Sequence, residues 1–536
     1  GFMRFKGELD AERVPVQRDR KGQPLCMDQW RYMYGTTRVP GLHVDALAQS
    51  SDSQHIVVMR KGHMFRVEFG DLAHLCWAFR KVVEESEEGA AQSIGALTGW
   101  ARNKWSAARK RLIALSAANA ATLRIIESAA FVVVLDSGVV QGDGNGANNA
   151  ATLESDDDQV RRFHHCTGGQ DRWFDKSFTV IVNPVGQVGL NVEHSWAEAS
   201  VPLSVMSGPV ASFVRQCYSN EKMAGPALTS TSPLVGPRGG DAKAAFLASQ
   251  RRGHGGCYKL QSWQLDEEVM SNIAEAQTTL AAMEADSDIS LIRCHDYTAR
   301  TMKALKVSPD SCLQMAIQLA FYRIHGRSPH GTYETAVLTQ FLKGRTATCR
   351  VVSTESQAFC WAMVDHMDNS SSNDGESDSD NNNTSKNKAI AAFKLACKSH
   401  ISYIQKTSRG EGVDRHLLGL SASLPPTFAA PPPAVSVLFK DPLFLRAQSW
   451  ELSTSNNSYL DNSGGHFGTV NPNGYGIGYL AKKGYTYFAV ECKRSARLAA
   501  ESHQSAAKRM SAACVQALTD IHTLFSVGPA SGTAKI

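Results

Sequence analysis

A histidine followed four residues later by a glutamate is the first candidate for chemistry in the sequence. The segment Glu193-His194-Ser195-Trp196-Ala197-Glu198 comes directly after residues with a strand pattern, so His194 is expected at a strand end, where an imidazole can face a cleft. Glu198 can hold the second ring nitrogen of His194 by a hydrogen bond, which is the arrangement of an oriented general base. By itself, the pattern favours an ordinary surface or core histidine, which is the commoner case.

Three consecutive hydroxyl residues, Ser453-Thr454-Ser455, form a second candidate. Side-chain hydroxyls can line a polar wall and donate hydrogen bonds to an oxyanion that develops in an acyl transfer. The alternative is an ordinary Ser/Thr turn, because such turns are common.

A basic stretch precedes a predicted helix in the second half of the chain. Arg300, Lys303 and Lys306 come before Ser308-Pro309, which is a helix start with serine as the N-cap and proline in the first turn. Positive side chains near a helix N-terminus suit the binding of phosphate groups. The alternative is a solvated charged face.

Several classes of protein lack their usual motifs here. There is no Walker A sequence and no G-x-S-x-G elbow, and Gly474–Gly478 does not fit the dinucleotide pattern. The twelve cysteines form no C-x-x-C pair, and His164-His165-Cys166 has no second half at zinc spacing, so no metal site is predicted. Unpaired cysteines indicate a reducing compartment.

Composition limits the partners. The chain has 536 residues, 43% of them hydrophobic and 20% charged, which is typical of a globular protein of several domains. The net charge is only +5 and no basic block occurs, so we expect no nucleic-acid partner. No run of 18 apolar residues is present that could span a bilayer.

The elements that must position the candidates alternate between strands and helices, which predicts a large α/β protein. Strands and hairpins are predicted at His55–Phe69, Ala130–Asp136, Ser177–Glu193 and Tyr475–Cys492. Helices are predicted at Leu72–Ser86, Ala101–Ala118, Glu267–Ala285, Pro309–His325, Ala389–Thr407 and Ala499–Phe525. Loops or insertions are predicted at Gln141–Asp158, Asn220–Gly256, Asp368–Lys388 and Leu424–Ala434, the third of them as a disordered insert.

In their order and in the residues they contain, several short segments of the sequence resemble the carnitine/choline acyltransferase family, and most closely its type I carnitine palmitoyltransferases. The resemblance covers nearly the whole chain outside the predicted insertions. It rests on collinear matches at Pro24–Cys26, Arg38–Pro40, His55–Val58, Asp171–Thr179, Glu193–Ala197, Ser308–Asp310, Thr332–Glu334, Gly344–Thr346, Asp414–Leu418, Leu452–Ser455 and Gly474–Gly476.

The resemblance implies a fold of two domains like chloramphenicol acetyltransferase, each with a mixed sheet flanked by helices, and an active-site tunnel between them. The domains are expected at residues 1–258, with the catalytic histidine, and 259–536, with the coenzyme A and carnitine sites and the insert at about 368–388.

The family's functional residues map onto matching positions of this sequence. The resemblance implies a general base, His194, its partner Glu198 and an oxyanion donor, Ser455. It implies coenzyme A binding by Arg300, Lys303, Lys306, Ser308 and Asp310, carnitine binding by Tyr333, Thr346, Arg415, Ser453 and Phe467, and a gate on the acyl tunnel at Gly465. Departures from the family pattern, which bear on affinity more than on chemistry, occur at Glu198, Ala299, Ala304, Ala347, His466, Thr469 and Asn473.

The implied activity is reversible transfer of a long-chain acyl group between coenzyme A and the 3-hydroxyl of carnitine. Both molecules are substrates, no cofactor is required, and malonyl-CoA is an inhibitor to test. Alternatives are a medium-chain enzyme, a choline acetyltransferase, and a non-catalytic sensor of acyl-CoA or malonyl-CoA. Resemblance to the type I enzymes implies the mitochondrial outer membrane, facing the cytosol, with membrane contact only through a segment that would precede Gly1.

Overall fold

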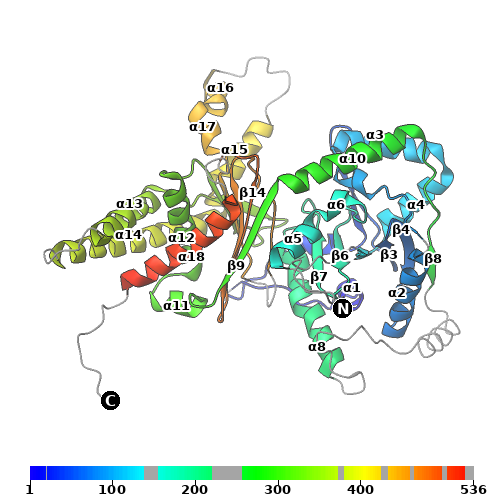
Figure 1. The fold of residues 1–536 in the computed structure, drawn as a ribbon, viewed down its shortest axis with the longest axis horizontal. Helices are drawn as coiled ribbons and strands as arrows, with labels where there is room; N and C mark the ends of the chain where they lie inside the picture. Colours follow the sequence, from blue (N-terminus) through cyan, green and yellow to red (C-terminus); the bar gives the residue numbers. More distant parts are fainter. Residues whose placement is uncertain are drawn as a thin grey trace. The chain divides into compact units, whose positions relative to one another are not determined.

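The chain folds into two compact units, Gly1–Ala285 and Asp286–Ile536, in a computed structural model (Figure 1). The structure describes residues 1–19, 21–87, 89–137, 155–219, 256–371, 379–423, 433–458, 464–497 and 504–525. The division between the units falls after the boundary that the sequence suggested near residue 258, because β8 (Cys257–Lys259) pairs with β4 and α10 (Glu267–Asp286) packs its Val269 and Ile273 into the core of the first unit.

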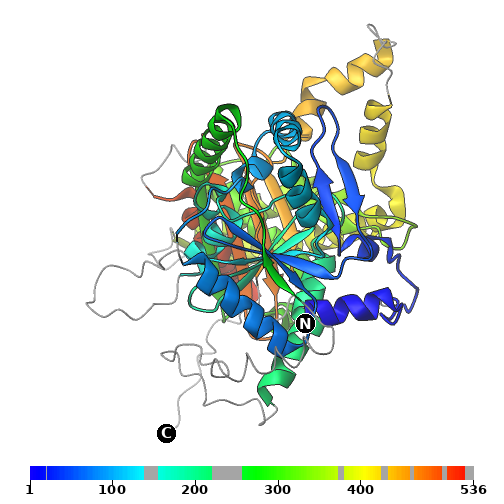
Figure 2. The ribbon, with the colours of Figure 1, turned by 90° about the vertical axis from the view of Figure 1, so that its right-hand side faces the viewer.

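The first unit contains a six-stranded sheet in the order β7-β6-β5-β3-β4-β8. Its remaining strands are β3 (His55–Arg60), β4 (His63–Glu68), β5 (Val132–Leu135), β6 (Phe178–Val182) and β7 (Val188–Val192). Consecutive residues of β3 alternate between two hydrophobic clusters, with Val58 in one and Val57 in the other. Both faces of this sheet are therefore buried, and its strands fan out in Figure 2 with the usual twist.

The second unit contains a six-stranded sheet with the same pattern of pairing, in the order β11-β10-β12-β13-β14-β9. In each sheet, three neighbouring strands run parallel and the remaining pairs are antiparallel. The strands are β9 (Ser287–Cys294), β10 (Thr332–Val337), β11 (Thr346–Cys349), β12 (Leu452–Asn456), β13 (Tyr475–Ala481) and β14 (Thr486–Lys493). The predicted class, α/β with two mixed sheets flanked by helices, is confirmed.

The two faces of the second sheet differ. One packs against helices α12 (Pro309–His325), α13 (Thr354–Ser371), α14 (Ser379–Lys406) and α18 (Ala506–Phe525), which lie together on one side of it (Figure 1). This covered face supplies Leu452, Ile477 and Tyr479 to the core. Among the described residues, the opposite face has a small apolar cluster around Leu480 and is otherwise polar or glycine-rich.

Other elements connect or flank these layers. A separate two-stranded ribbon, β1 (Thr36–Val39) and β2 (Ala46–Gln49), stands out in Figure 2 in blue. The remaining helices are α1 (Phe2–Asp10), α2 (Leu72–Ser86), α3 (Arg102–Leu115), α4 (Ala117–Ser128), α5 (Asp156–His164), α6 (Cys166–Gly169), α7 (Ser200–Val205), α8 (Ala211–Ser219), α11 (Ala299–Ala304), α15 (Val413–Ala422), α16 (Pro433–Lys440) and α17 (Pro442–Ala447). Among the described residues, no helix is both long and apolar enough to cross a membrane.

Most predicted elements are confirmed, including the three hairpins and the starts of α2 and α12. The helix predicted over Ala101–Ala118 is confirmed as α3 over Arg102–Leu115, but its predicted end is wrong. Ser116 adopts an extended conformation between α3 and α4, and its hydroxyl caps α4 by accepting a hydrogen bond from the Ala118 amide.

The disordered insert expected at about 368–388 is wrong where the structure describes it. Helix α13 continues to Ser371 and α14 begins at Ser379, and the His366 ring lies 3.0 Å from the Ser385 hydroxyl of the neighbouring helix. Packing between the two helices overrides a polar composition. Residues 372–378 lie outside the described part, as do 141–154, 220–255 and 424–432 of the other predicted insertions.

Candidate functional site

His194 lies on a short loop just after strand β7, as the sequence predicted. The loop is held from inside, because the buried Trp196 donates its indole N–H to the backbone carbonyl of Ser177 at 2.9 Å. Ala197 beside it is fully buried. With its neighbours anchored in this way, the loop presents the His194 side chain outward, 64% exposed.

Glu198 is the carboxylate next to this histidine. Its Oε2 lies 3.8 Å from Nε2 of His194, and its backbone N–H donates to the side-chain carbonyl of Gln29 at 2.8 Å. At 3.8 Å this contact is longer than a hydrogen bond, so the carboxylate can orient the imidazole without binding it tightly. An accessible ring beside an oriented carboxylate is suited to general acid–base chemistry.

On the second sheet, strand pairing brings several predicted site residues into one row. Tyr333 of β10 pairs with Ser453 of β12, which pairs with Gly476 of β13, which pairs with Glu491 of β14. Paired residues point to the same face of a sheet. Tyr333, Ser453 and Glu491 therefore share the face opposite the helices, which we call the polar face.

Ser455 belongs to the polar face as well, in the next row, where its partner is Gly478. Thr454 between the two serines does not. Its hydroxyl accepts from the Gln314 amide at 2.9 Å and donates to the Tyr333 carbonyl at 2.8 Å, on the helix-covered side. The expected wall of three hydroxyls thus consists of two, because alternate residues of a strand face opposite ways.

Thr346 and Arg415 meet at the edge of this sheet. Thr346 on β11 pairs with Val337 of β10, which lies on the polar face four residues along β10 from Tyr333. The exposed Arg415, near the start of α15, donates Nε–H to the Thr346 carbonyl at 3.1 Å. The preceding Asp414 is buried and accepts two hydrogen bonds from Arg350, which fixes the start of the helix.

The predicted coenzyme A residues fall into two groups. Arg300, Lys303 and Lys306 are exposed on or just after α11, as phosphate-binding cations must be. Ser308 is the N-cap of α12, although its side chain makes no capping hydrogen bond. Asp310 differs, because its carboxylate accepts hydrogen bonds from the Tyr479 hydroxyl and the Asn456 amide, as part of a network behind the strands.

That network centres on a buried histidine that the sequence did not single out. Nε2 of His400 lies 2.6 Å from Oε2 of Glu334, and its Nδ1 lies 2.8 Å from the Ser311 hydroxyl. The Tyr479 hydroxyl, which donates to Asp310, also lies 3.1 Å from the other Glu334 oxygen. Glu334 follows Tyr333, so the network fixes the strand that presents Tyr333 on the opposite face.

Burial and charge shift the proton affinities in this network. Burial alone would lower the pKa of His400, but the adjacent Glu334 carboxylate outweighs it and the pKa is raised. Burial, together with the charge of Glu334, raises the pKa of Asp310 to about 6. Cys349 offers a third donor atom within 4.8 Å of those of Glu334 and His400, so the geometry admits a metal ion, although the hydrogen bonds at both His400 nitrogens already account for the cluster.

Gly465 and Phe467 lie on a segment that crosses the polar face over β13. A Cβ atom at Gly478 would lie 2.4 Å from the Gly465 carbonyl oxygen, and one at Gly476 would lie 3.1 Å from the Phe467 carbonyl oxygen. The glycines of β13 therefore let this segment lie directly on the strand. A Cβ atom at Gly465 itself would meet the Asn457 amide at 2.8 Å.

The second unit therefore brings Tyr333, Thr346, Ser453 and Ser455 to one face, with Gly465 and Phe467 on the segment across it. In the first unit, His194 and Glu198 are adjacent. Asp310 lies in the network with Tyr479 and Asn456, and its role in coenzyme A binding stays a prediction. The segments Ser308–Asp310 and Thr332–Glu334 resemble the family's sequence, but only the tertiary contacts reveal what Asp310 and Glu334 touch.

Comparison with known proteins agrees with these features. The family model described as "Choline/Carnitine o-acyltransferase" matches residues 1–513. Carnitine O-acetyltransferase of Rattus norvegicus is 29% identical over 99% of this chain and 76% of its own length. Carnitine O-palmitoyltransferase 1, muscle isoform, of Sus scrofa is 28% identical over 98% of this chain and 63% of its own length. Because the family model spans almost the whole sequence, the chain belongs to the choline/carnitine O-acyltransferase family.

Proposed function

We propose that the protein transfers a fatty acyl group reversibly between coenzyme A and the 3-hydroxyl of carnitine. The observation that carries this proposal is the row of Tyr333 and Ser453 on the polar face, with Ser455 in the next row. Hydroxyl groups on paired central strands are held by the sheet and need little reorganisation when charge develops beside them.

In the proposed reaction, His194 accepts the proton of the carnitine 3-hydroxyl as the oxygen attacks the thioester carbonyl carbon. The tetrahedral oxyanion accepts a hydrogen bond from the Ser455 hydroxyl. Collapse breaks the carbon–sulfur bond, and the coenzyme A thiolate takes the proton from the His194 imidazolium. Proton transfer and hydrogen bonding account for every step, and no covalent enzyme intermediate forms.

For carnitine, we assign the carboxylate to Arg415 with Tyr333, Thr346 and Ser453. Two observations support this assignment: Arg415 is exposed, and its Nε–H donates to the Thr346 carbonyl. This hydrogen bond places the planar guanidinium group at the edge of the polar face, where its other N–H groups can bind a carboxylate. A quaternary ammonium cannot be hydrogen-bonded and favours an aromatic face, a role that we assign to Phe467. Choline has no carboxylate, so an acceptor assay with choline in place of carnitine separates the two substrates.

For the acyl group, we propose a preference for long over short chains. Gly465 adds no side chain to its segment, and each buried methylene of a substrate contributes about 0.8 kcal/mol. Since a Cβ atom at Gly465 would press on the Asn457 amide, Gly465→Met should disturb this region and lower the use of palmitoyl-CoA more than that of acetyl-CoA. Wild-type protein that prefers acetyl-CoA would contradict the chain-length proposal and leave carnitine acyl transfer intact.

The decisive experiment is a radiometric exchange between labelled carnitine and acyl-CoA of several lengths, with and without malonyl-CoA. We expect acylcarnitine to form with the wild type and with His43→Ala, which removes an exposed histidine of the same unit, and not with His194→Ala. Acyl-CoA binding without exchange in the wild type would indicate the sensor. The proposed mitochondrial location rests on similarity to carnitine O-palmitoyltransferase 1 and is tested by imaging the tagged protein.

A further inference from the structure

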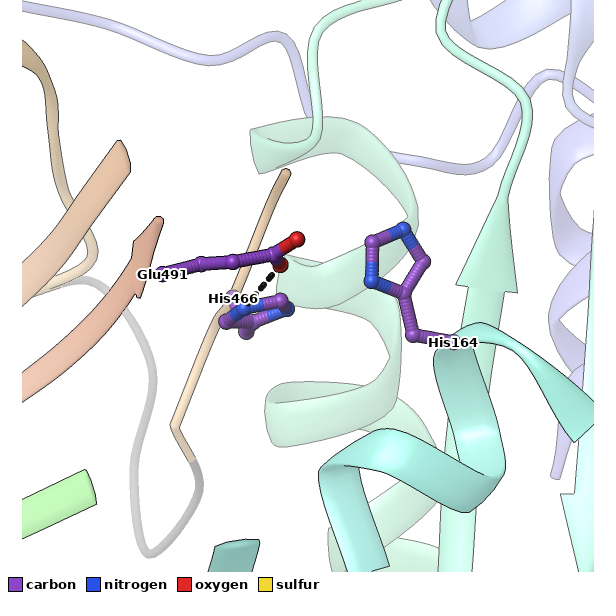
Figure 3. Close-up of side chains that lie close together, drawn as sticks. All are labelled: His164, His466 and Glu491. Carbon is purple, nitrogen blue, oxygen red and sulfur yellow. Dashed lines mark ion pairs between the residues drawn. The ribbon is translucent and has the colours of Figure 1, made fainter. Parts of the chain in front are cut away.

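A buried ion pair lies on the polar face of the second sheet, apart from the residues assigned above. Nε2 of His466 lies 2.8 Å from Oε2 of Glu491, and their side chains are 6% and 2% exposed (Figure 3). The other carboxylate oxygen of Glu491 accepts a hydrogen bond from the Ser287 hydroxyl of β9 at 2.9 Å. One oxygen of the carboxylate thus contacts the sheet, and the other contacts His466.

The pair joins two different parts of the unit. Glu491 belongs to β14 and projects from the row that contains Gly476 and Ser453. His466 belongs to the glycine-rich segment Gly464–Gly468 that crosses β13, between Gly465 and Phe467. The ion pair therefore ties the middle of this segment to the β14 side of the sheet.

The β12 side holds the segment less strongly. The Asn457 amide donates to the Gly465 carbonyl at 3.3 Å, which is a long hydrogen bond between neutral groups. Gly476 and Gly478, which lie under the segment, have no side chains that could contact it. The contact between His466 and Glu491 is the closer of these two restraints, at 2.8 Å against 3.3 Å, and both of its side chains are buried.

We propose that His466 and Glu491 are positioning residues, which anchor the Gly464–Gly468 segment so that Gly465 and Phe467 are presented to the acyl chain and the carnitine ammonium. The assignment of those two contacts rests on the proposed function. The anchor itself rests on the ion pair and on the close approach of the segment to β13. Neither residue takes part in proton transfer.

A double-mutant cycle tests this. His466→Ala and Glu491→Gln should each raise KM for carnitine about tenfold and change kcat less than about threefold. The double variant should also show about a tenfold rise, because the second substitution removes a contact that is already lost. A hundredfold rise in the double variant, or unchanged KM in both single variants, would overturn the proposal.

Amide hydrogen exchange of the peptide that contains residues 464–468 provides a readout that does not need activity. It should be faster in both single variants and no faster still in the double variant. As a matched control, Asp520→Asn breaks the ion pair between Arg323 of α12 and Asp520 of α18, and should leave KM and this peptide unchanged. If the wild type transfers nothing to carnitine, the proposed function fails, and the exchange pattern still decides for or against the anchor.

Discussion

The histidine–glutamate pair His194–Glu198 of the first unit and the pair His400–Glu334 of the second differ in burial and in distance. His194 is 64% exposed and lies 3.8 Å from Glu198, whereas His400 and Glu334 are almost fully buried and lie 2.6 Å apart. Both His400 nitrogens have partners. The same two residue types therefore form an accessible, loosely oriented pair at His194 and a rigid internal contact at His400.

The difference shows how burial separates a histidine that can act in catalysis from one that stabilises the fold. An exposed imidazole can gain and lose a proton at little cost to folding, which a general base requires. A buried charge must keep its partner, because leaving it unpaired costs several kcal/mol. His400 therefore supports the strand of Tyr333 and is unsuited to turnover.

The largest expected effect separates the two histidines. His194→Ala should lower kcat by about 10² to 10⁴ and leave the unfolding midpoint unchanged, since general acid–base catalysis typically contributes that much. Steady-state exchange kinetics and thermal unfolding of the same preparation measure both. If His194→Ala retains a tenth of wild-type kcat, His194 is not the base.

Breaking the buried pair should act on stability instead. Glu334→Gln leaves the His400 imidazolium without its carboxylate, and loss of one partner of a buried pair costs about 3 to 5 kcal/mol. Urea unfolding followed by circular dichroism measures this free energy. Glu198→Gln is the control at the exposed pair, and a similar loss of stability there would remove the contrast.

Ser455→Ala tests the oxyanion donor on the polar face. Removing one such donor commonly lowers kcat by about 10² to 10³. KM for either substrate should change little, because the hydrogen bond strengthens only as negative charge develops. Thr454→Val is informative beside it, since that side chain faces the helices and should affect folding first. A Ser455 variant altered only in KM would reassign Ser455 to binding.

The buried network also predicts a dependence of stability on pH. Asp310 has a folded pKa of about 6, above its ordinary 3.8, so its contribution is fully present below about pH 4 and is lost as the pH rises through 6. The raised pKa of His400 acts in the same direction at higher pH. Denaturation of the wild type and Asp310→Asn across pH 4 to 8 should reveal a difference of up to about 3 kcal/mol. Parallel curves for the two proteins would exclude this role.

Arg415→Ala should have the smallest effect of the five and confine it to one substrate. A hydrogen bond to a charged group contributes about 1.5 to 3 kcal/mol, so KM for carnitine should rise roughly ten- to a hundredfold. KM for acyl-CoA measured in the same assay should stay constant. Equal changes in both would indicate that α15 has lost its place.

Much of the site follows from local sequence. The strand before His194, the hairpin at Tyr475–Cys492 and the helix start at Pro309 all come from patterns within a few residues, and the structure has them. The surroundings of Asp310 do not, because its partners Asn456 and Tyr479 lie more than a hundred residues away. Only contact in the folded chain shows that this carboxylate belongs to the sheet network.

The sequence by itself determined the candidate residues and the alternation of strand side chains, since the strand period of two is a local property of the backbone. It did not determine which strands lie side by side. Register between distant strands is set by packing of the whole sheet, and a shift by one residue would turn every side chain to the other face. Tertiary structure alone therefore decided that Tyr333 and Ser453 share a face with Glu491, and that Thr454 does not.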